Sequence, residues 1–238
     1  MTRYSTLLSA LRRLDTSCLC DAEKALLRTT NNLANGYQPL CLMEGLVPRG
    51  SMGKTTTVGM ARTVQCVEPD DFFAVLQGLD SSQSDEVLVV NTRNSQKAVA
   101  GELFCAEASR RGLTGIIIDG PMRDTCFLSN YPNVRCYSRS VTPYSGTISH
   151  PGEMNIIIEC GGVTVESNHH MIVADDDGIL VGAPETFQQL EQSAREIQQA
   201  EDRIRQVIAN GTSLHGMTNY TEHLEALKKG ESSSLKFL

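Results

Sequence analysis

Three side chains that can bind a metal ion and an anion lie close together in the sequence. Glu102 stands at the start of a helix-like stretch, and twenty residues separate it from the pair Arg123-Asp124. Carboxylates are hard oxygen ligands that suit Mg²⁺ or Mn²⁺, whereas a guanidinium can hold a carboxylate or an oxo-acid through two parallel hydrogen bonds. The combination indicates a divalent cation beside a small anionic substrate. A cation there would polarise an oxo group and stabilise an enolate.

The pattern around these residues predicts how they are positioned. Apolar residues at helical spacing predict an amphipathic helix over 97–111, with Gly112 as its stop. The β-branched run 115–119, bounded by glycines, predicts a strand that is buried on both faces and ends at Asp119-Gly120. Arg123 and Asp124 would then follow the carboxyl end of a strand, where binding groups concentrate because loops there carry polar side chains.

Backbone groups could extend this site. If a helix starts near residue 101, the N–H groups of Gly101 to Leu103 would offer an anion site for a substrate carboxylate. Taken singly, each residue also has an ordinary explanation, namely a surface Arg-Asp pair at a turn and a solvated helix glutamate. Their combination favours the functional interpretation.

Several motifs resemble the 4-hydroxy-4-methyl-2-oxoglutarate aldolase family, which also contains the regulator of ribonuclease E activity A (RraA). They are Gly101-Glu102-Leu103, Arg110-Arg111-Gly112-Leu113-Thr114-Gly115, Asp119-Gly120-Pro121-Met122-Arg123-Asp124, Gly161-Gly162-Val163-Thr164-Val165 and Ala174-Asp175-Asp176-Asp177-Gly178. The similarity extends from about Asp21 to about Leu214, and the block 101–124 is its most specific part.

This resemblance implies a metal-dependent class II aldolase that splits a 4-hydroxy-2-oxo acid to release pyruvate, often with decarboxylation of oxaloacetate. By position, Arg123 would hold the pyruvate moiety, and Asp124 would bind Mg²⁺ or Mn²⁺ directly or through water. Glu102 would complete the hydrated metal site or orient a water that carries protons, and Leu103 would contribute a backbone amide. The resemblance also implies a homotrimer or homohexamer of compact β/β/α domains with sites near the subunit interfaces.

Other features differ from the family pattern and leave two alternatives open. The chain has Glu166-Ser167-Asn168-His169-His170 where the family usually has a Pro-Gly-Asp turn, and the strand 155–160 lacks the common proline. The same pocket could therefore serve another carbon–carbon or proton-transfer reaction, or the chain could be a non-catalytic regulator that binds a protein. A carboxylate from a neighbouring subunit helps some members, and only location suggests candidates here: Glu191, Glu196 and Glu201.

The length of 238 residues and the lack of a linker-like stretch predict one domain over 1–238. The resemblance implies a core of about 21–214, and the Gly-Glu-Ser-Ser-Ser run predicts a mobile tail of about 229–238. The net charge of −7, from 21 Lys and Arg against 28 Asp and Glu, argues against nucleic acid and acidic membranes as partners. The sequence shows no signal-peptide pattern and no apolar run long enough to span a membrane, so the protein is expected in the cytoplasm. The eight cysteines show no Cys-x-x-Cys pair and are expected to be mostly buried thiols.

The remaining patterns predict a mixed α/β fold, in which strands outnumber helices from the middle onward. Two N-terminal helices are expected, the first with a Leu7 to Leu14 stripe and the second near 20–27, and a long C-terminal helix is expected over 184–209. β-forming residues predict a long strand at 55–67 and another strand at 86–91. Short runs predict further strands at 134–137, 155–160, 163–166, 171–174 and 178–181.

Overall fold

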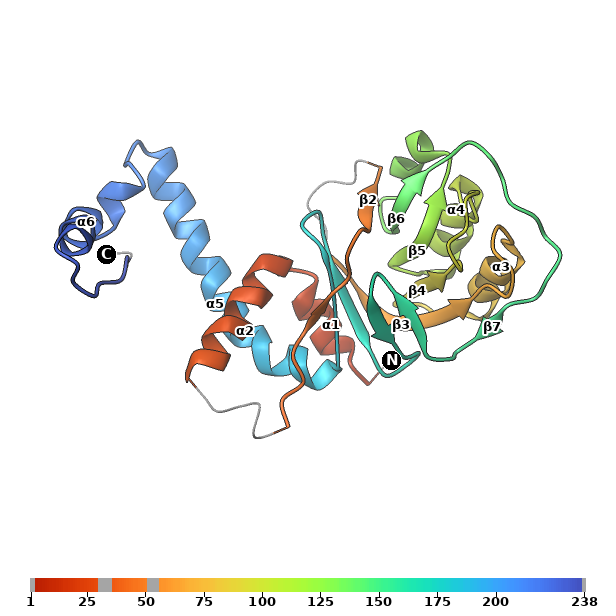
Figure 1. The fold of residues 1–238 in the computed structure, drawn as a ribbon, viewed down its shortest axis with the longest axis horizontal. Coiled ribbons are helices and arrows are strands. Elements are labelled where there is room, and N and C mark those ends of the chain that lie inside the picture. The colour runs from red at the N-terminus through yellow and green to blue at the C-terminus, as the bar shows by residue number, and fades with distance from the viewer. Residues whose placement is uncertain (1–2, 30–35, 51–55, 237–238) are drawn as a thin grey trace. The chain divides into compact units, whose positions relative to one another are not determined.

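The computed structural model describes residues 3–29, 36–50 and 56–236 (Figure 1). The chain forms two compact units, residues 1–194 and residues 195–238, and the helix α5 (Pro184–Ala209) contributes to both. The expectation of a single domain over 1–238 stays a prediction.

A mixed sheet forms the centre of the first unit (Figure 1). Its four middle strands are parallel: β3 (Thr57–Gln65), β4 (Glu86–Asn91), β5 (Gly115–Met122) and β6 (Arg135–Val141). Shorter antiparallel strands extend it: β1 (Cys41–Leu42), β2 (Val47–Arg49), β7 (Glu153–Met154), β10 (Met171–Ala174) and β11 (Ile179–Gly182). The path through the sheet is β1-β11-β10-β3-β4-β5-β6-β2, and β7 pairs with β3 beside it.

Both faces of the parallel strands are covered, as the β-branched runs predict. Helices α3 (Phe73–Ser81) and α4 (Glu102–Arg111) cover one face, where Ile116 and Ile118 pack. The two-stranded sheet of β8 (Ile158–Cys160) and β9 (Val163–Val165) covers the other face, where Ile117 packs. Each fully buried isoleucine contributes roughly 2–3 kcal/mol through removal of apolar surface from water. The layered β/β/α arrangement is confirmed.

Helices precede and follow this sheet. The first unit begins with α1 (Ser5–Leu11) and α2 (Thr16–Thr29), which confirm the two predicted N-terminal helices. The second unit contains the end of α5, the short helix η3 (His215–Met217) and α6 (Tyr220–Lys228). Asn219 hydrogen-bonds the backbone of Ser234 and Lys236, so part of the tail is connected to the start of α6.

Several predicted elements have different bounds, three of them near the candidate site or opposite the helices. Residues 97–101 are not helical, and the helix begins at Glu102, because Ala98 and Ala100 form isolated bridges with Ser145 and Met122. Strand β5 continues beyond Asp119-Gly120 to Met122, with an irregular register that accommodates Pro121. Only Ile158–Cys160 of the predicted strand 155–160 is regular.

Candidate active site at the end of strand β5

The backbone at the end of β5 lies beside the segment that leads into α4. Ala100 forms a parallel bridge with Met122, and the N–H of Arg123 donates to the carbonyl of Ala100 at 3.1 Å. Gly101 is the N-cap of α4, and Gly112 ends the helix in the left-handed conformation. This pairing brings the start of α4 next to Arg123 and Asp124, although twenty residues separate them in the chain.

Gly101 is required at the contact because any larger residue would collide with the site. A Cβ there would lie 2.6 Å from Oδ2 of Asp124 and 3.0 Å from Cγ of Arg123. The backbone of Gly101 is extended, so glycine is needed for space and not for its conformational freedom. Its missing side chain lets the carboxylate of Asp124 approach the amino end of the helix.

Arg123 and Asp124 form an ion pair with 3.2 Å between Nε and Oδ2, and about 40 % of each side chain is exposed. Asp124 has a positive φ of 57°, a region that aspartate adopts more readily than most residues, and it is the N-cap of η2 (Thr125–Asn130). The turn directs the carboxylate back toward Gly101. A planar donor group and a free carboxylate edge therefore both face solvent at one place.

A small cavity of about 40 Å³ lies against this pair. Its lining includes Gly101, Leu103, Arg123 and Asp124, together with residues far away in the sequence such as Phe72 and Ser145. The first N–H groups of α4, those of Glu102 and Leu103, have no partner within the helix because of helix geometry. The volume suffices for one or two waters or a cation, but not for an oxo-acid.

Glu102 lies beside this cavity but is not among the residues that line it. Its carboxylate accepts a hydrogen bond from the hydroxyl of Tyr131, the residue after η2. That hydrogen bond raises the pKa of Tyr131 above its usual value. The structure therefore brings Arg123, Asp124, Gly101 and Leu103 together at the cavity, while Glu102 is held on the adjoining surface between α4 and η2. Tyr131 was not predicted, since a single tyrosine before a proline carries no functional signal.

Residues 142–150, here named the strap, run along the other rim of the cavity. The N–H of Ala98 donates to the backbone carbonyl of Tyr144 at 2.9 Å, and the N–H of Gly146 donates to the backbone carbonyl of Ala98 at 3.1 Å. The backbone N–H of Phe72 donates to the backbone carbonyl of Thr147 at 2.9 Å. The strap thus joins the loop before α3 to the segment before α4. These contacts connect distant loops and could not be predicted from local patterns.

Two aspartates fasten the strap and the segment before α4. The carboxylate of Asp71, only 1 % exposed, accepts from the N–H groups of Ser149 and His150, both at 2.8 Å. Asp70 accepts from the hydroxyl of Ser95 and from two backbone amides that follow it. Burial raises the pKa of both carboxyls, but these hydrogen bonds outweigh it, so both pKa values lie below their usual range.

No group of three or more His, Cys, Asp or Glu side chains within the described ranges is arranged to hold a metal ion. The His169-His170 pair is no exception. His169 is exposed, and Nδ1 of His170 accepts from the N–H of Glu166 at 3.0 Å, while burial lowers the pKa of His170. A cation at Asp124 would therefore take most of its ligands from water.

Comparison with known proteins decides the family. The family described as RraA-like: Aldolase/RraA matches residues 16–181, which include the whole site at the end of β5. The chain belongs to the RraA-like aldolase family. The resemblance predicted from the motifs is confirmed, and so is the fold class.

Relatives of this RraA-like protein carry aldolase and regulator names. A protein of Halalkalibacterium halodurans named "Putative 4-hydroxy-4-methyl-2-oxoglutarate aldolase" is 28 % identical over 200 residues, which is 84 % of this chain and 86 % of that protein. A protein of Shewanella oneidensis with the same name is 32 % identical over 151 residues, 63 % of this chain and 90 % of its own length. The RNA-processing inhibitor RraA from Thermus thermophilis has a TM-score of 0.54 at 25 % identity, over 64 % of this chain and 90 % of that one.

An uncharacterized protein from Pseudomonas syringae pv. tomato covers more of this RraA-like chain. Its crystal structure has a TM-score of 0.67 at 25 % identity, over 88 % of this chain and 95 % of that one. In the part of the chain that the structure describes, no helix is long and apolar enough to cross a bilayer.

Proposed function

We propose that this RraA-like protein is a divalent-metal-dependent lyase that cleaves a 4-hydroxy-2-oxo acid and releases pyruvate, and that it also decarboxylates oxaloacetate. The observation that carries the proposal is the pairing of Arg123 with Asp124, 3.2 Å apart, against the amino end of α4. A guanidinium, a carboxylate and helix N–H groups at one cavity are what binding and activating a small oxo-acid requires.

The donor set at this site fits a hydrated Mg²⁺ or Mn²⁺. Asp124 offers a partly exposed carboxylate edge, and such ions commonly take one or two protein carboxylates and several waters. Asp124 would hold the cation, and Glu102 would act through water from the adjoining surface. When bound, the cation supplies a Lewis acid for the oxo group of the substrate.

Arg123 would bind the substrate carboxylate. Its guanidinium can form two parallel hydrogen bonds, and the free N–H groups at the start of α4, including that of Leu103, can add a third donor. This arrangement fixes the direction of the substrate, with its oxo group toward Asp124. Orientation of this kind removes much of the entropic part of the barrier.

The cleavage requires the transfer of one proton, from the C4 hydroxyl of the substrate to C3 of the product. The C4 hydroxyl gives up its proton, the C3–C4 bond breaks, and its electron pair forms the enolate of pyruvate. The enolate then takes up a proton at C3. In oxaloacetate the same bond breaks with loss of carbon dioxide. Glu102, held by Tyr131, would orient the water that carries the proton.

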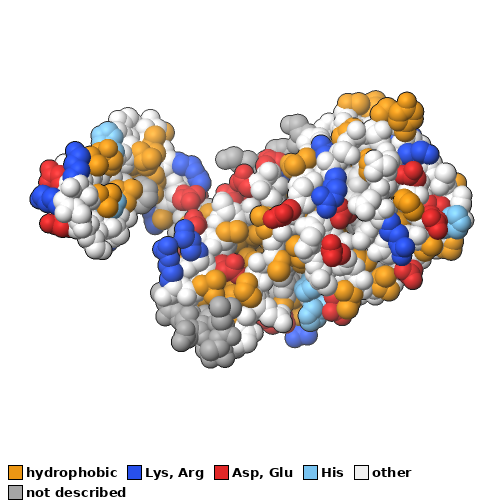
Figure 2. Space-filling view, in the orientation of Figure 1, with side chains coloured by type: hydrophobic (Ala, Val, Ile, Leu, Met, Phe, Trp, Pro, Cys, Tyr) orange, Lys and Arg blue, Asp and Glu red, His pale blue; other side chains and the backbone are white. Residues whose placement is uncertain are grey.

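The cavity needs a further wall before it can enclose such a substrate. Its volume is about 40 Å³, and apolar side chains at its rim face solvent: Leu103 is 74 % exposed and Tyr144 73 %. Figure 2 shows hydrophobic side chains gathered on the rim of the first unit near β6. A second copy of this chain, in a homotrimer or homohexamer, would supply the missing wall.

Purified protein with Mg²⁺ or Mn²⁺ is expected to release pyruvate from oxaloacetate or a 4-hydroxy-2-oxo acid, as measured with a coupled lactate dehydrogenase assay. Chelation should stop the release. Arg123→Ala and Asp124→Asn should each lower kcat/KM at least ~100-fold, since each removes a group that touches substrate or cation. Arg110→Ala is the matched control, because Arg110 lies on α4, outside the cavity lining, and pairs with Glu107 on the surface.

The same assay separates the alternatives. Turnover that survives both Arg123→Ala and Asp124→Asn would place the chemistry elsewhere and contradict the proposal. No turnover over a panel of such acids, with the cation shown to bind by calorimetry, would favour another reaction or a non-catalytic regulator.

A further inference from the structure

A second cleft lies at the opposite end of the parallel strands. It has a volume of about 380 Å³, within the range typical of small-molecule sites. Thr57 starts β3, Thr114 precedes β5 and Arg135 starts β6, so the cleft opens at the amino ends of these strands. Arg123 and Asp124 follow the carboxyl end of β5, roughly 25 Å away along an eight-residue strand. The two sites are therefore separate.

The charged side chains that line the cleft are two guanidiniums, those of Arg12 and Arg135, and one carboxylate, that of Asp85. Arg12 pairs with Asp85, whereas Arg135 pairs with Asp176, which does not line the cleft. An anionic ligand that displaces Asp176 would therefore meet positive charge in the cleft.

Arg135 provides the strongest anchor for an anion. Its side chain is only 4 % exposed, whereas its ion-pair partner Asp176 is 71 % exposed and lies in the turn between β10 and β11. A buried guanidinium requires a negative partner. Because Asp176 is exposed and lies in a turn, another anion can replace it as that partner. A ligand carboxylate or phosphate in the cleft could take the place of Asp176 beside Arg135.

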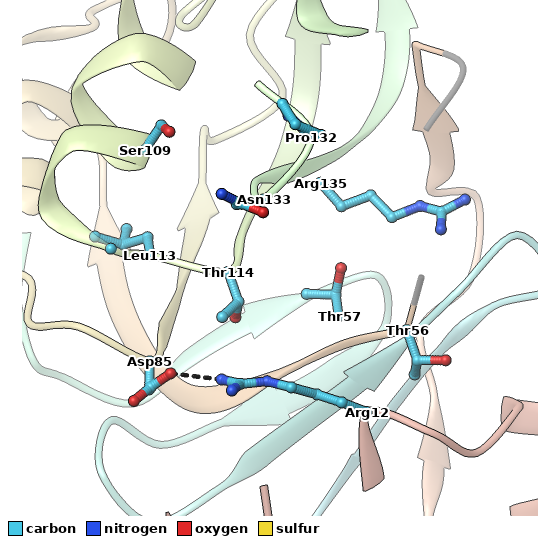
Figure 3. A pocket seen from close by; sticks show the side chains of 11 residues that line it. Arg12, Thr56, Thr57, Asp85, Ser109, Leu113, Thr114, Pro132, Asn133 and Arg135 are labelled. Carbon is cyan, nitrogen blue, oxygen red and sulfur yellow. Dashed lines mark hydrogen bonds and ion pairs between the residues drawn. The ribbon is translucent and has the colours of Figure 1, made fainter. Parts of the chain in front are cut away.

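Arg12 forms the opposite side of the cleft. Its Nη2 lies 2.5 Å from Oδ1 of Asp85, and both side chains are nearly 40 % exposed (Figure 3). An exposed pair of this kind contributes little stability, so its members can turn toward a ligand. Arg12 could then donate to an oxyanion while Asp85 accepts from a ligand hydroxyl.

Neutral polar groups complete the lining. Among the described residues, the side chains of Ser109 and Asn133 make no hydrogen bond, although both border the cleft. Figure 3 shows Asn133 and Thr114 near one another, with Thr57 across from them. Hydroxyl and amide groups that lack partners suit a ligand with several hydroxyls.

We propose that this cleft binds a small hydroxylated metabolite that carries a carboxylate or a phosphate, at a site independent of Arg123 and Asp124. Arg135 holds the oxyanion on one side of the cleft, Arg12 contacts the ligand from the opposite side, and Asp85, Ser109 and Asn133 contact the hydroxyls. Both a hydroxy acid and a sugar phosphate share this chemistry, and the choice of probes distinguishes them.

Isothermal titration calorimetry of the full chain with citrate, ribose 5-phosphate and inorganic phosphate tests the proposal. At least one of the two hydroxylated probes should bind more tightly than phosphate, and the tighter one identifies the ligand class. Arg12→Gln should weaken binding about tenfold, the effect expected from loss of one charge-assisted hydrogen bond. Arg28→Gln is the matched control, since Arg28 is an exposed arginine at the end of α2.

A second variant tests the cleft without removing a charged side chain that could be needed for folding. Asn133→Ala removes a side chain that makes no hydrogen bond to any described residue, so it should leave the unfolding transition unchanged, yet weaken binding. Arg123→Ala should leave binding unchanged. The proposal is overturned if no probe binds at millimolar concentration, if Arg12→Gln and Asn133→Ala both leave binding intact, or if Arg123→Ala abolishes it.

Discussion

A missing Cβ determines where Asp124 can place its carboxylate. A Cβ at position 101 would lie 2.6 Å from Oδ2, which is shorter than real Cβ contacts, and Oδ2 is the far end of a side chain that can rotate. A larger residue at 101 would therefore move the carboxylate and leave the backbone in place. The function of this glycine is to let a charged group and a helix start share one small space.

Gly101→Ala should thus separate activity from stability. The unfolding transition should shift by less than ~1 kcal/mol, because the added methyl displaces only flexible atoms. Pyruvate release should fall roughly 100-fold, the size of effect that a misplacement of about 1 Å can cause. Urea unfolding and the coupled assay measure the two quantities. A large loss of stability would show that the backbone, and not Asp124, yields.

The thiols offer a second test at the residue scale. Cys20, Cys41 and Cys126 are exposed, whereas Cys18, Cys66, Cys105, Cys136 and Cys160 are buried. Burial and the nearby carboxylates of Glu23, Asp21 and Asp175 raise the pKa of Cys20, so it has less of the reactive thiolate. A chromogenic disulfide reagent should modify Cys41 and Cys126 first, Cys20 more slowly and the other five only on unfolding. Peptide mass spectrometry identifies the order, and early modification of Cys105 or Cys136 would contradict it.

The residues of the candidate site could be predicted only in part. Arg123, Asp124, Gly101 and Leu103 carry a spacing that chemistry and family likeness both indicate, and the structure brings them together. Phe72 and Ser145 could not be predicted, because they reach the cavity through loops whose pairing is not local. The orientation of Glu102 toward Tyr131 depends on η2, a short helix without a sequence signal.

At the scale of elements, buried strands and long helices were the predictable part. Strands β4 and β10 and helix α5 have the predicted bounds, because continuous apolar runs and a sustained helical period leave little choice. The stretch 97–101 was predicted to be helical but forms bends and isolated bridges. Its hydrogen bonds to the strap and to the end of β5 outweigh its local propensity. Helix α3 was not predicted at all.

The strap offers a pH-dependent test of such non-local contacts. The pKa values of Asp70 and Asp71 are lower in the folded state, so these carboxylates stabilise the fold fully above their ordinary pKa of 3.8. The stabilisation is lost as the pH falls through the lower folded-state values. Asp71→Asn should lower the free energy of unfolding by about 2–3 kcal/mol at pH 7, the value of a hydrogen bond to a charged group. The loss should be much smaller once the pH is below both the folded-state and the ordinary pKa of Asp71.

Urea unfolding of the wild type and of Asp71→Asn, from pH 7 down to the acid transition, gives the difference directly. Asp177→Asn is the control, since Asp177 is an exposed residue of the β10–β11 turn. A difference between wild type and Asp71→Asn that does not shrink in acid would show that Asp71 acts through packing and not through its charge.

At the scale of the whole molecule, the exposed apolar side chains around the candidate site require an explanation. Tyr144 on the strap, Phe127 on η2 and Leu103 on α4 are each more than half exposed. Leu103 lines the cavity, Tyr144 precedes the lining residue Ser145, and η2 begins directly after the lining residue Asp124. Single exposed apolar residues are ordinary, but several around one cavity that is too small for its substrate indicate an interface. A partner copy would remove them from water and enlarge the enclosed space.

The mass of the protein in solution tests this last step. Light scattering after size exclusion should give three or six times the chain mass of 26.0 kDa. Tyr144→Glu places a charge in the proposed interface and should shift the protein toward single chains and lower pyruvate release, because the cavity loses its outer wall. Tyr144→Phe keeps the apolar ring and should change neither. If Tyr144→Glu leaves the mass unchanged, or if dissociated chains keep full activity, the site does not need a second copy, and the cavity must open within the chain itself.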